Sequence, residues 1–309
     1  MTKIALRTTW LGTLIWTILL PGVSLGQSPT PTPKTRLVLL GTGTPNPDPD
    51  RWGPALAIVV NKQAYLVDCG PGVVRRAAAA RRAGIGALAA HKLTHVFITH
   101  LHSDHTLGYP DLIFSPWVLN RNVPLEAFGP PGLGDMTDHL HQAYQQDVRM
   151  RIEGLEGANP RGHRVNVHEI QPGLVFEDQN VRVVAFQVRH GSWKHAYGYR
   201  FETADRVIVV SGDTAPSENL VKHAKGCDLL VHEVYCQATF DRRPPRWQRY
   251  HASFHTSTVQ LAEIANRVQP KLLVLTHQLL WGATPQQMLA EITSRYKGPV
   301  RFGNDLDVY

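Results

Sequence analysis

The stretch Thr99-His100-Leu101-His102-Ser103-Asp104-His105 directs the interpretation of the chain, because it places four metal-ligand side chains within six residues. It directly follows the apolar run 95–98, which we interpret as a β-strand. Imidazole nitrogen suits Zn²⁺ and related ions, and a carboxylate also suits a harder cation. A tight turn after the strand would direct His100 and His102 to one metal and Asp104 and His105 to another. The stretch therefore predicts part of a two-metal centre rather than a histidine-rich surface loop.

One loop cannot complete two metal shells, so further ligands are expected at the ends of other strands. Three polar residues occupy such positions: His190, Asp213 and His277 each follow a run rich in strand-forming residues. Taken singly, such a residue is more often part of an ordinary turn. Together with the first cluster, all three become candidate ligands at one edge of a sheet.

Short apolar runs and segments with helical periodicity make up most of the chain. Strands are expected at 36–40, 55–60, 64–67, 95–98, 181–188, 197–201, 207–210, 229–231 and 272–275. Helices are expected at 73–82, 134–146, 217–224 and 256–268. This mixture is typical of a layered α/β domain. Two further segments, 152–163 and 237–254, are expected to form loops over the site.

The N-terminal residues differ from the rest. Lys3 and Arg7 precede the apolar stretch 10–20, and small residues then end at Gly26, which is typical of a cleavable signal peptide. The alternative is a membrane anchor, but the apolar stretch is about half of what a bilayer requires. We expect a signal peptide at 1–26, a Pro/Thr-rich linker at 27–34 and one domain at 35–309. The mature protein would be periplasmic or secreted and free of the membrane.

The composition adds three constraints. The chain has 309 residues and is 43% hydrophobic, which is enough for a sizeable core. Three cysteines are too few for a disulfide framework, so free thiols are expected. The formal net charge of +7 favours anionic ligands.

Several segments give the chain a family resemblance. It resembles the metallo-β-lactamase superfamily, and within it the branch of ribonuclease Z-like phosphodiesterases and arylsulfatases. The resemblance spans nearly all of 36–309 and is carried by 40–45 (LGTGTP), 66–72 (LVDCGPG), 99–105 (THLHSDH), 190–199, 211–214 (SGDT), 232–233 (HE) and 275–277 (LTH). It implies a four-layer αββα sandwich, in which helices flank two mixed β-sheets and the metals lie at one edge.

The resemblance also implies which ligands share a metal. One metal would be held by His100, His102 and His190. The other would be held by Asp104, His105 and His277, with Asp213 bridging the two. We expect two divalent ions, with Zn²⁺ preferred and Mn²⁺ or Fe²⁺ as alternatives, and hydrolysis by a hydroxide that bridges the metals.

The leaving group of such a hydrolysis needs a proton. By the resemblance, His255 would be the general acid and Glu233 would orient it, and with Asp104 they make up the expected catalytic set. His251 is the alternative acid. Asp68 is expected either to contact a ligand histidine or to cap a turn.

The second expected loop contains candidate substrate-binding residues. These are Arg242, Arg243, Arg246 and Trp247. The arginines could bind an anion, and Trp247 could stack on a base or an aryl ring. A solvated surface loop is the alternative.

Two observations direct the expected substrate away from tRNA. Ribonuclease Z proteins carry a tRNA-gripping arm between the third and fourth motifs, whereas only positions 191–212 separate the corresponding residues here. Export would also separate the protein from tRNA precursors. We therefore expect an exported binuclear zinc hydrolase that cleaves phosphodiester or aryl sulfate esters, with a small anionic or aryl ester as substrate. Because relatives with this fold are often dimers, a homodimer is compatible.

Four alternatives stay open at this point. The first two are a ribonuclease Z-type tRNA 3′ endonuclease and a lactonase or β-lactamase-like hydrolase. The others are a metal-binding protein without activity and an iron oxidoreductase on the same fold.

Overall fold

The computed structural model describes residues 1–2 and 35–309. The predicted signal peptide and linker therefore lie outside the described residues, apart from the first two. Residues 35–309 belong to one compact unit. In the described part of the chain, no helix is long and apolar enough to cross a bilayer.

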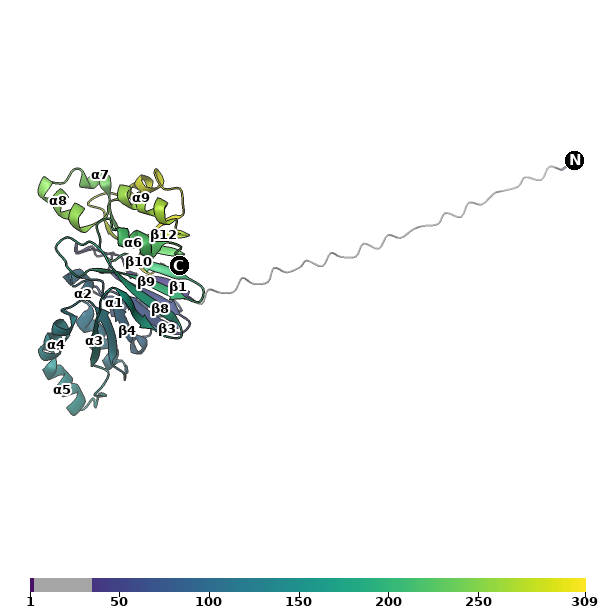
Figure 1. Cartoon of the computed structure of the whole chain (residues 1–309). Helices are drawn as coiled ribbons and strands as arrows, with labels where there is room; N and C mark the ends of the chain where they lie inside the picture. Colours follow the sequence, from purple (N-terminus) through teal and green to yellow (C-terminus); the bar gives the residue numbers. More distant parts are fainter. Residues whose placement is uncertain (3–34) are drawn as a thin grey trace. The chain divides into compact units, whose positions relative to one another are not determined.

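Two mixed β-sheets lie face to face at the centre of this unit (Figure 1). The first sheet contains, in spatial order, β1 (Thr35–Gly41), β2 (Ala55–Val60), β3 (Gln63–Val67), β4 (His95–Phe97), β5 (Leu125–Gly129) and β6 (Val165–Glu169). The second contains β13 (Val300–Phe302), β12 (Leu272–Leu279), β11 (Leu229–Tyr235), β10 (Val207–Val210), β9 (Tyr197–Thr203), β8 (Val181–Gln187) and β7 (Gly173–Glu177). Strands β3 to β6 and β10 to β13 are parallel, and the other pairs are antiparallel.

Helices cover the outer face of each sheet. Helices α1 (Val73–Arg82) and α3 (Tyr109–Val118) pack on the first sheet. Helices α6 (Glu218–Ala224), α9 (Thr258–Val268) and α10 (Pro285–Thr293) pack on the second. The remaining helices are α2 (Ser103–Thr106), α4 (Leu133–Ala143), α5 (Gln145–Glu153), α7 (Gln237–Phe240), α8 (Pro245–Phe254) and the short η1 (Gly86–Leu88) and η2 (Ala90–Lys92). The predicted αββα sandwich is confirmed.

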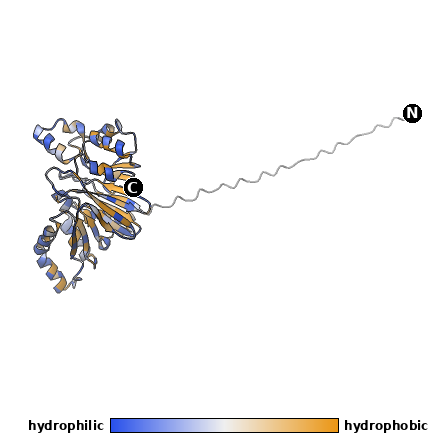
Figure 2. Cartoon of the chain, in the orientation of Figure 1, coloured by the Kyte–Doolittle hydropathy of each residue, from blue (hydrophilic) through white to orange (hydrophobic). Residues whose placement is uncertain are grey.

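Alternation along the strands divides the core into layers. In β2, Ala57 and Val59 face α1, whereas Leu56 and Ile58 face the second sheet. All of β2 is buried because both of its faces are covered, and Figure 2 shows the hydrophobic residues concentrated in the strands. Replacing Ile58 by alanine would lower the free energy of unfolding by about 2–5 kcal/mol.

Three sequence predictions are wrong in the region around these sheets. The segment 237–254 forms α7 and α8 rather than a loop, because Pro245 occupies the first position of α8, where proline is tolerated. The predicted helix 134–146 is two helices that meet at Tyr144. The segment 152–163 packs elsewhere: Trp117 Nε1 donates to the Asn159 carbonyl at 2.7 Å.

The cysteine prediction is confirmed. Cys69, Cys227 and Cys236 are free and buried. Burial raises the pKa of the Cys227 thiol to about 12, so this thiol stays protonated.

Candidate metal centre

The seven predicted metal ligands come from separate elements and meet at one edge of the sandwich. His100 and His102 follow β4, Asp104 and His105 lie in α2, His190 follows β8, Asp213 follows β10, and His277 lies in β12. All are buried except His102, which is half-buried. The structure therefore gathers all of them into one polar cluster within the apolar core.

Three imidazole nitrogens converge in the first group. His102 Nδ1 lies 2.9 Å from His100 Nε2 and 3.0 Å from His190 Nε2. Together with Asp213, these residues offer one ligand atom each, all within 4.8 Å of one another. Such a set can surround a single cation.

The second group lies beside the first and shares the Asp213 carboxylate with it. Asp104 Oδ2 lies 3.2 Å from His277 Nε2 and 3.5 Å from His105 Nε2. Asp213 Oδ2 lies 3.5 Å from each of the same two nitrogens. Asp213 therefore stands between the two groups, as the family resemblance implies for a bridging ligand.

Asp68 orients two of the histidine rings through contacts at Nδ1, on the side away from the metal site. Its carboxylate accepts a hydrogen bond from His105 Nδ1 at 2.8 Å and another from Thr99 Oγ1 at 2.9 Å. Because the Thr99 hydroxyl donates to Asp68, it accepts from His100 Nδ1 at 2.9 Å. Both rings therefore direct the lone pair of Nε2 into the site, which is the tautomer that a metal requires. Asp68 thus contacts a predicted ligand histidine, one of the two roles expected for it.

His190 is held in the same way by a backbone group. Its Nδ1 donates to the carbonyl oxygen of Phe254 at 2.8 Å. The next residue, Gly191, has a φ of +53°, and a Cβ atom there would lie 2.0 Å from the Phe254 ring. Only glycine fits both the backbone conformation and the close ring.

His277 reaches the site from an irregularity in its strand. In the pairing of β11 with β12, Glu233 pairs with Thr276 and Val234 pairs with Gln278. His277 is thus the extra residue of a β-bulge, and its φ of 44° lies in the left-handed region. Bulges beside sites commonly redirect a side chain, and a non-glycine residue in this conformation marks local strain.

The electrostatics of the cluster fit bound cations. Burial lowers the pKa of His190 to about 3, so this ring is neutral, as a ligand must be. Burial also lowers the pKa of His105, but the carboxylates of Asp213, Asp68 and Asp104 outweigh it and raise that pKa well above its usual value. His105 Nε2 is buried without a hydrogen-bond partner. Divalent cations would both bind this nitrogen and balance the carboxylate charge.

The predicted catalytic pair lies at the inner side of the cluster. His255 Nδ1 is 3.4 Å from Glu233 Oε1 and 3.9 Å from Asp213 Oδ2. Glu233 Oε1 also accepts the backbone N–H groups of Thr214 at 3.2 Å and Thr256 at 3.0 Å. Burial raises the pKa of Glu233 well above its usual value and lowers that of His255 to about 4. Glu233 is thus fixed by the backbone at a position where it can orient the His255 ring.

His251, the alternative acid, is placed less favourably. It is buried one helical turn before His255 on α8, and its aromatic contacts are with Trp247, Tyr250, His255 and Trp281. His255, by contrast, joins Asp213 and His277 in a third group whose ligand atoms lie within 4.8 Å of one another. The geometry favours His255 over His251 as the residue that acts beside the metals.

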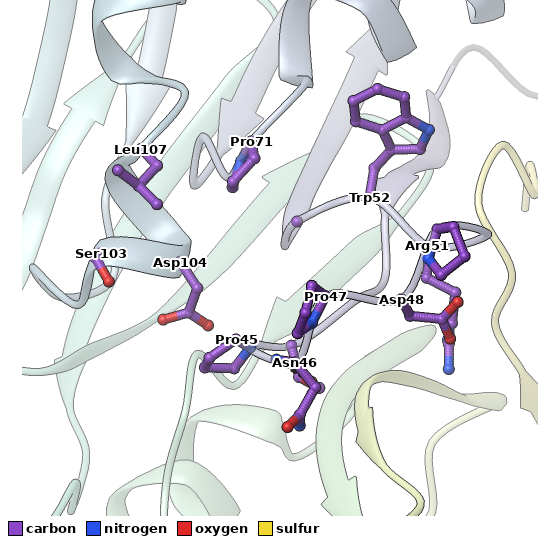
Figure 3. A pocket seen from close by; sticks show the side chains of 13 residues that line it. Pro45, Asn46, Pro47, Asp48, Arg51, Trp52, Pro71, Ser103, Asp104 and Leu107 are labelled. Carbon is purple, nitrogen blue, oxygen red and sulfur yellow. Dashed lines mark hydrogen bonds between the residues drawn. The ribbon is translucent and has the colours of Figure 1, made fainter.

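A pocket lies beside the cluster and is lined in part by one of the predicted ligands, Asp104 (Figure 3). It has a volume of about 380 Å³, and most residues between 44 and 53 line it together with Pro71, Ser103 and Leu107. The sequence prediction missed this pocket. The sequence feature that could have indicated the pocket is the series of prolines at positions 45, 47 and 49, because these prolines stiffen an exposed loop between two strands.

An edge site of this composition on an αββα sandwich defines a metal-dependent hydrolase. The chain belongs to the beta-lactamase superfamily, because the model of the beta-lactamase superfamily domain matches residues 63–278.

Within this superfamily, a sequence relative and two solved structures are similar to the chain. Ribonuclease Z of Mycobacterium bovis (strain BCG / Pasteur 1173P2) is 34% identical over 264 residues, which cover 83% of this chain and 91% of the relative. The metallo-beta-lactamase fold protein YhfI from Bacillus subtilis has a TM-score of 0.68 at 16% identity, covering 89% of this chain and 99% of its own. The short form of human tRNase Z has a TM-score of 0.66 at 24% identity, covering 89% and 98%. The two solved structures support the fold.

The mycobacterial relative contradicts the expected substrate. The sequence favoured small phosphodiester or aryl sulfate esters as the substrate and made tRNA unlikely, with a ribonuclease Z-type endonuclease as an alternative. That preference is wrong, and the alternative fits better. The preference rested on the expected export and on the short segment 191–212, which has no room for an RNA-gripping arm. Yet a protein named ribonuclease Z aligns along most of its own length with this chain. An arm is one means of holding RNA, so its absence does not exclude RNA as a substrate.

Proposed function

We propose that this chain is a two-metal ribonuclease of the ribonuclease Z type, which hydrolyses a phosphodiester bond on the 3′ side of tRNA. The observation that carries the proposal is the 34% identity over 264 residues to a ribonuclease Z. The complete ligand set supports it, because all seven predicted ligands lie together at one edge. The net charge of +7 also suits a polyanionic substrate.

We propose the same ligand division as the resemblance implies. His100, His102 and His190 would hold one cation, Asp104, His105 and His277 the other, and Asp213 would bridge them. Zn²⁺ is proposed because five of the seven ligands are histidines. When bound, two such cations lower the pKa of water and neutralise the charge that develops on the phosphate.

The chain's own residues supply orientation and the proton. As water attacks phosphorus and loses a proton, the bond from phosphorus to the leaving ribose oxygen breaks. That oxygen takes a proton from His255, so one proton is released and one is consumed. Glu233 Oε1 lies 3.4 Å from His255 Nδ1 and keeps the ring directed toward the cluster. The pocket beside Asp104 gives the substrate a path to the metals.

Parallel assays of the purified protein test this function. The substrates are a tRNA precursor with a 3′ trailer, bis-p-nitrophenyl phosphate and p-nitrophenyl sulfate, and metal content is measured on the same sample. We expect two metal ions per chain, cleavage of the precursor at one position, and turnover of the phosphate diester. Turnover of the sulfate with an intact precursor would contradict the proposal.

Export and the catalytic domain are separate proposals. We propose that 1–26 directs export and that a chain beginning at Thr35 folds and hydrolyses the diester unaided. Because export would separate the protein from tRNA precursors, export of the whole chain would count against a tRNA precursor as its natural substrate, whereas the phosphodiesterase activity would stand. Fusing 1–26 to a reporter that is active only outside the cytoplasm tests the first proposal, and an inactive fusion would contradict it. Activity of the shortened chain tests the second.

A further inference from the structure

Helix α8 carries arginine and aromatic side chains toward the solvent. The segment 237–254 contains four arginines and one aspartate, so it is strongly basic. The guanidinium carbon of Arg243 lies 4.4 Å from the ring centre of Trp281 and 5.8 Å from that of Trp247. We call Arg243, Trp247, Tyr250 and Trp281 the α8 platform. Arg246 also lies 5.3 Å from the Trp247 ring centre, and Tyr250 packs edge-on against Trp247 with ring centres 5.7 Å apart.

The α8 platform borders a cavity of its own. This cavity has a volume of about 370 Å³ and is lined by Thr239, Arg242, Arg243, Pro244, Trp247 and Trp281. Trp247 is 37% exposed and Tyr250 is 38% exposed. The Nε atom of Arg243 is buried without a hydrogen-bond partner. The cavity therefore places the partly exposed Trp247 ring beside two arginines, Arg242 and Arg243.

One row of rings connects the α8 platform to the metal centre. Trp247 stacks on His251 with ring centres 5.8 Å apart, and His251 lies 5.7 Å from His255. His255 in turn stacks on His277 at 5.8 Å. The row arises because residues four apart share one face of α8. It leads from the surface to a predicted metal ligand in three ring-to-ring steps.

A second row of rings runs beside the first. Tyr250 stacks on Phe254 with ring centres 4.4 Å apart, and Phe254 lies 4.9 Å from the ring of His190. Both exposed rings of α8 are therefore continuous with rings that belong to the metal centre. The connecting histidines are buried, so the rows show how near the α8 platform lies to the metals: three ring-to-ring steps of 5.7–5.8 Å separate Trp247 from His277. This distance is within reach of the nucleotides that flank a phosphate at the metals.

We infer that the α8 platform binds unpaired nucleotides of an RNA substrate next to the scissile phosphodiester. Its aromatic rings stack on the bases, and Arg243 pairs with a phosphate of the same strand. The inference rests on the proposed ribonuclease function and extends it to the residues that hold the strand.

Unpaired RNA fits this surface better than duplex RNA. Bases inside a duplex already stack on their neighbours, so they cannot cover an exposed tryptophan ring. Stacking on an aromatic ring tolerates any base. The mixture of arginine and aromatic residues therefore supplies contacts both to the phosphates and to the bases of a single strand. The platform would thus serve the purpose for which other ribonuclease Z proteins use an arm.

Kinetics of two substrates test the α8 platform. In Trp247→Ala and Arg243→Gln, we expect KM for the tRNA precursor to rise by about tenfold, because one stacking or phosphate contact is lost. Turnover of bis-p-nitrophenyl phosphate should change by less than about twofold, since this substrate is too small to reach both sites. Trp247→Phe should restore part of the loss. Arg81→Gln and Tyr144→Ala, which change exposed residues elsewhere, serve as controls.

A second measurement separates this inference from the proposed function. Short oligouridylate should inhibit the turnover of bis-p-nitrophenyl phosphate by the wild-type enzyme, with an inhibition constant about tenfold higher in Trp247→Ala. If the precursor is not cleaved but this difference holds, the α8 platform stands and the tRNA assignment fails. An equal inhibition constant, or a parallel loss for both substrates, would overturn the platform.

Discussion

The metal centre and helix α8 hold their functional side chains by different means. In the metal centre, buried histidines follow strand ends, and hydrogen bonds to Asp68, Thr99 and the Phe254 carbonyl fix three of the rings. On α8, side chains such as Trp247 are partly exposed and contact mainly other rings. Metal ligation requires fixed directions, whereas stacking tolerates small displacements. Substitutions should therefore have large effects in the first region and graded effects in the second.

Removing the shared carboxylate should have the largest effect. Because Asp213 lies 3.5 Å from nitrogens of both His105 and His277, Asp213→Ala should lower metal content and reduce turnover by about a thousandfold or more. Elemental analysis and bis-p-nitrophenyl phosphate turnover are the measurements. Asp241→Ala, on exposed α7–α8 surface, is the control. Full retention of both metals would show that Asp213 is no ligand.

Removing the proposed acid should separate turnover from metal binding. In His255→Ala, kcat for the tRNA precursor should fall by about 10²–10⁴-fold while metal content stays the same. His251→Ala, four residues earlier on the same helix face, should lose much less. An equal loss of metal and turnover in His255→Ala would make His255 a ligand instead, as its place beside Asp213 and His277 permits.

Removing the hydrogen bonds that orient two of the ligand histidines should have an effect of intermediate size on metal binding. Asp68→Ala removes the acceptor of His105 Nδ1 and of Thr99 Oγ1. Metal affinity, measured by competition with a chelator, should fall by about 10–100-fold. Unchanged affinity would mean that packing alone orients the His105 and His100 rings.

The contact between the two regions should have the smallest effect, and the effect is measured as a loss of stability. Gly191→Ala places a Cβ atom 2.0 Å from the Phe254 ring and requires a left-handed alanine. The free energy of unfolding should fall by about 1–3 kcal/mol, measured by urea denaturation. Gly84→Ala, also left-handed but in open space, isolates the contribution of the backbone. Equal losses in the two variants would remove any role for the Phe254 contact.

The same contrast explains which features of the fold and of the site could be predicted from the sequence alone. The segment 99–105 contains four metal-ligand side chains at a spacing that is rare outside metal sites. The short apolar runs elsewhere in the chain are clear enough to indicate the strands. Helix α8 gave a misleading signal, because Pro244 and Pro245 are as typical of a loop as of a helix start. In the row of rings, the steps from Trp247 to His251 and His255 follow from their four-residue spacing, whereas the step from His255 to His277 depends on tertiary packing, which no local pattern encodes.

The substrate could not be predicted from a missing segment. The shortness of 191–212 excludes one way of holding RNA, but it carries no information on surfaces elsewhere in the chain. The basic and aromatic residues of α8 were present in the sequence, yet their direction relative to the metals became clear only from the ring contacts.

The bulge at His277 has a consequence for the register of strand β12. His277 is an additional residue between the pairs Glu233–Thr276 and Val234–Gln278. Deleting this one residue would shift the rest of β12 by one position relative to β11. Because neighbouring residues of a strand point to opposite faces of the sheet, Gln278 and Leu279 would then exchange faces. The same residue therefore provides a ligand and sets the register of the strand end that follows it.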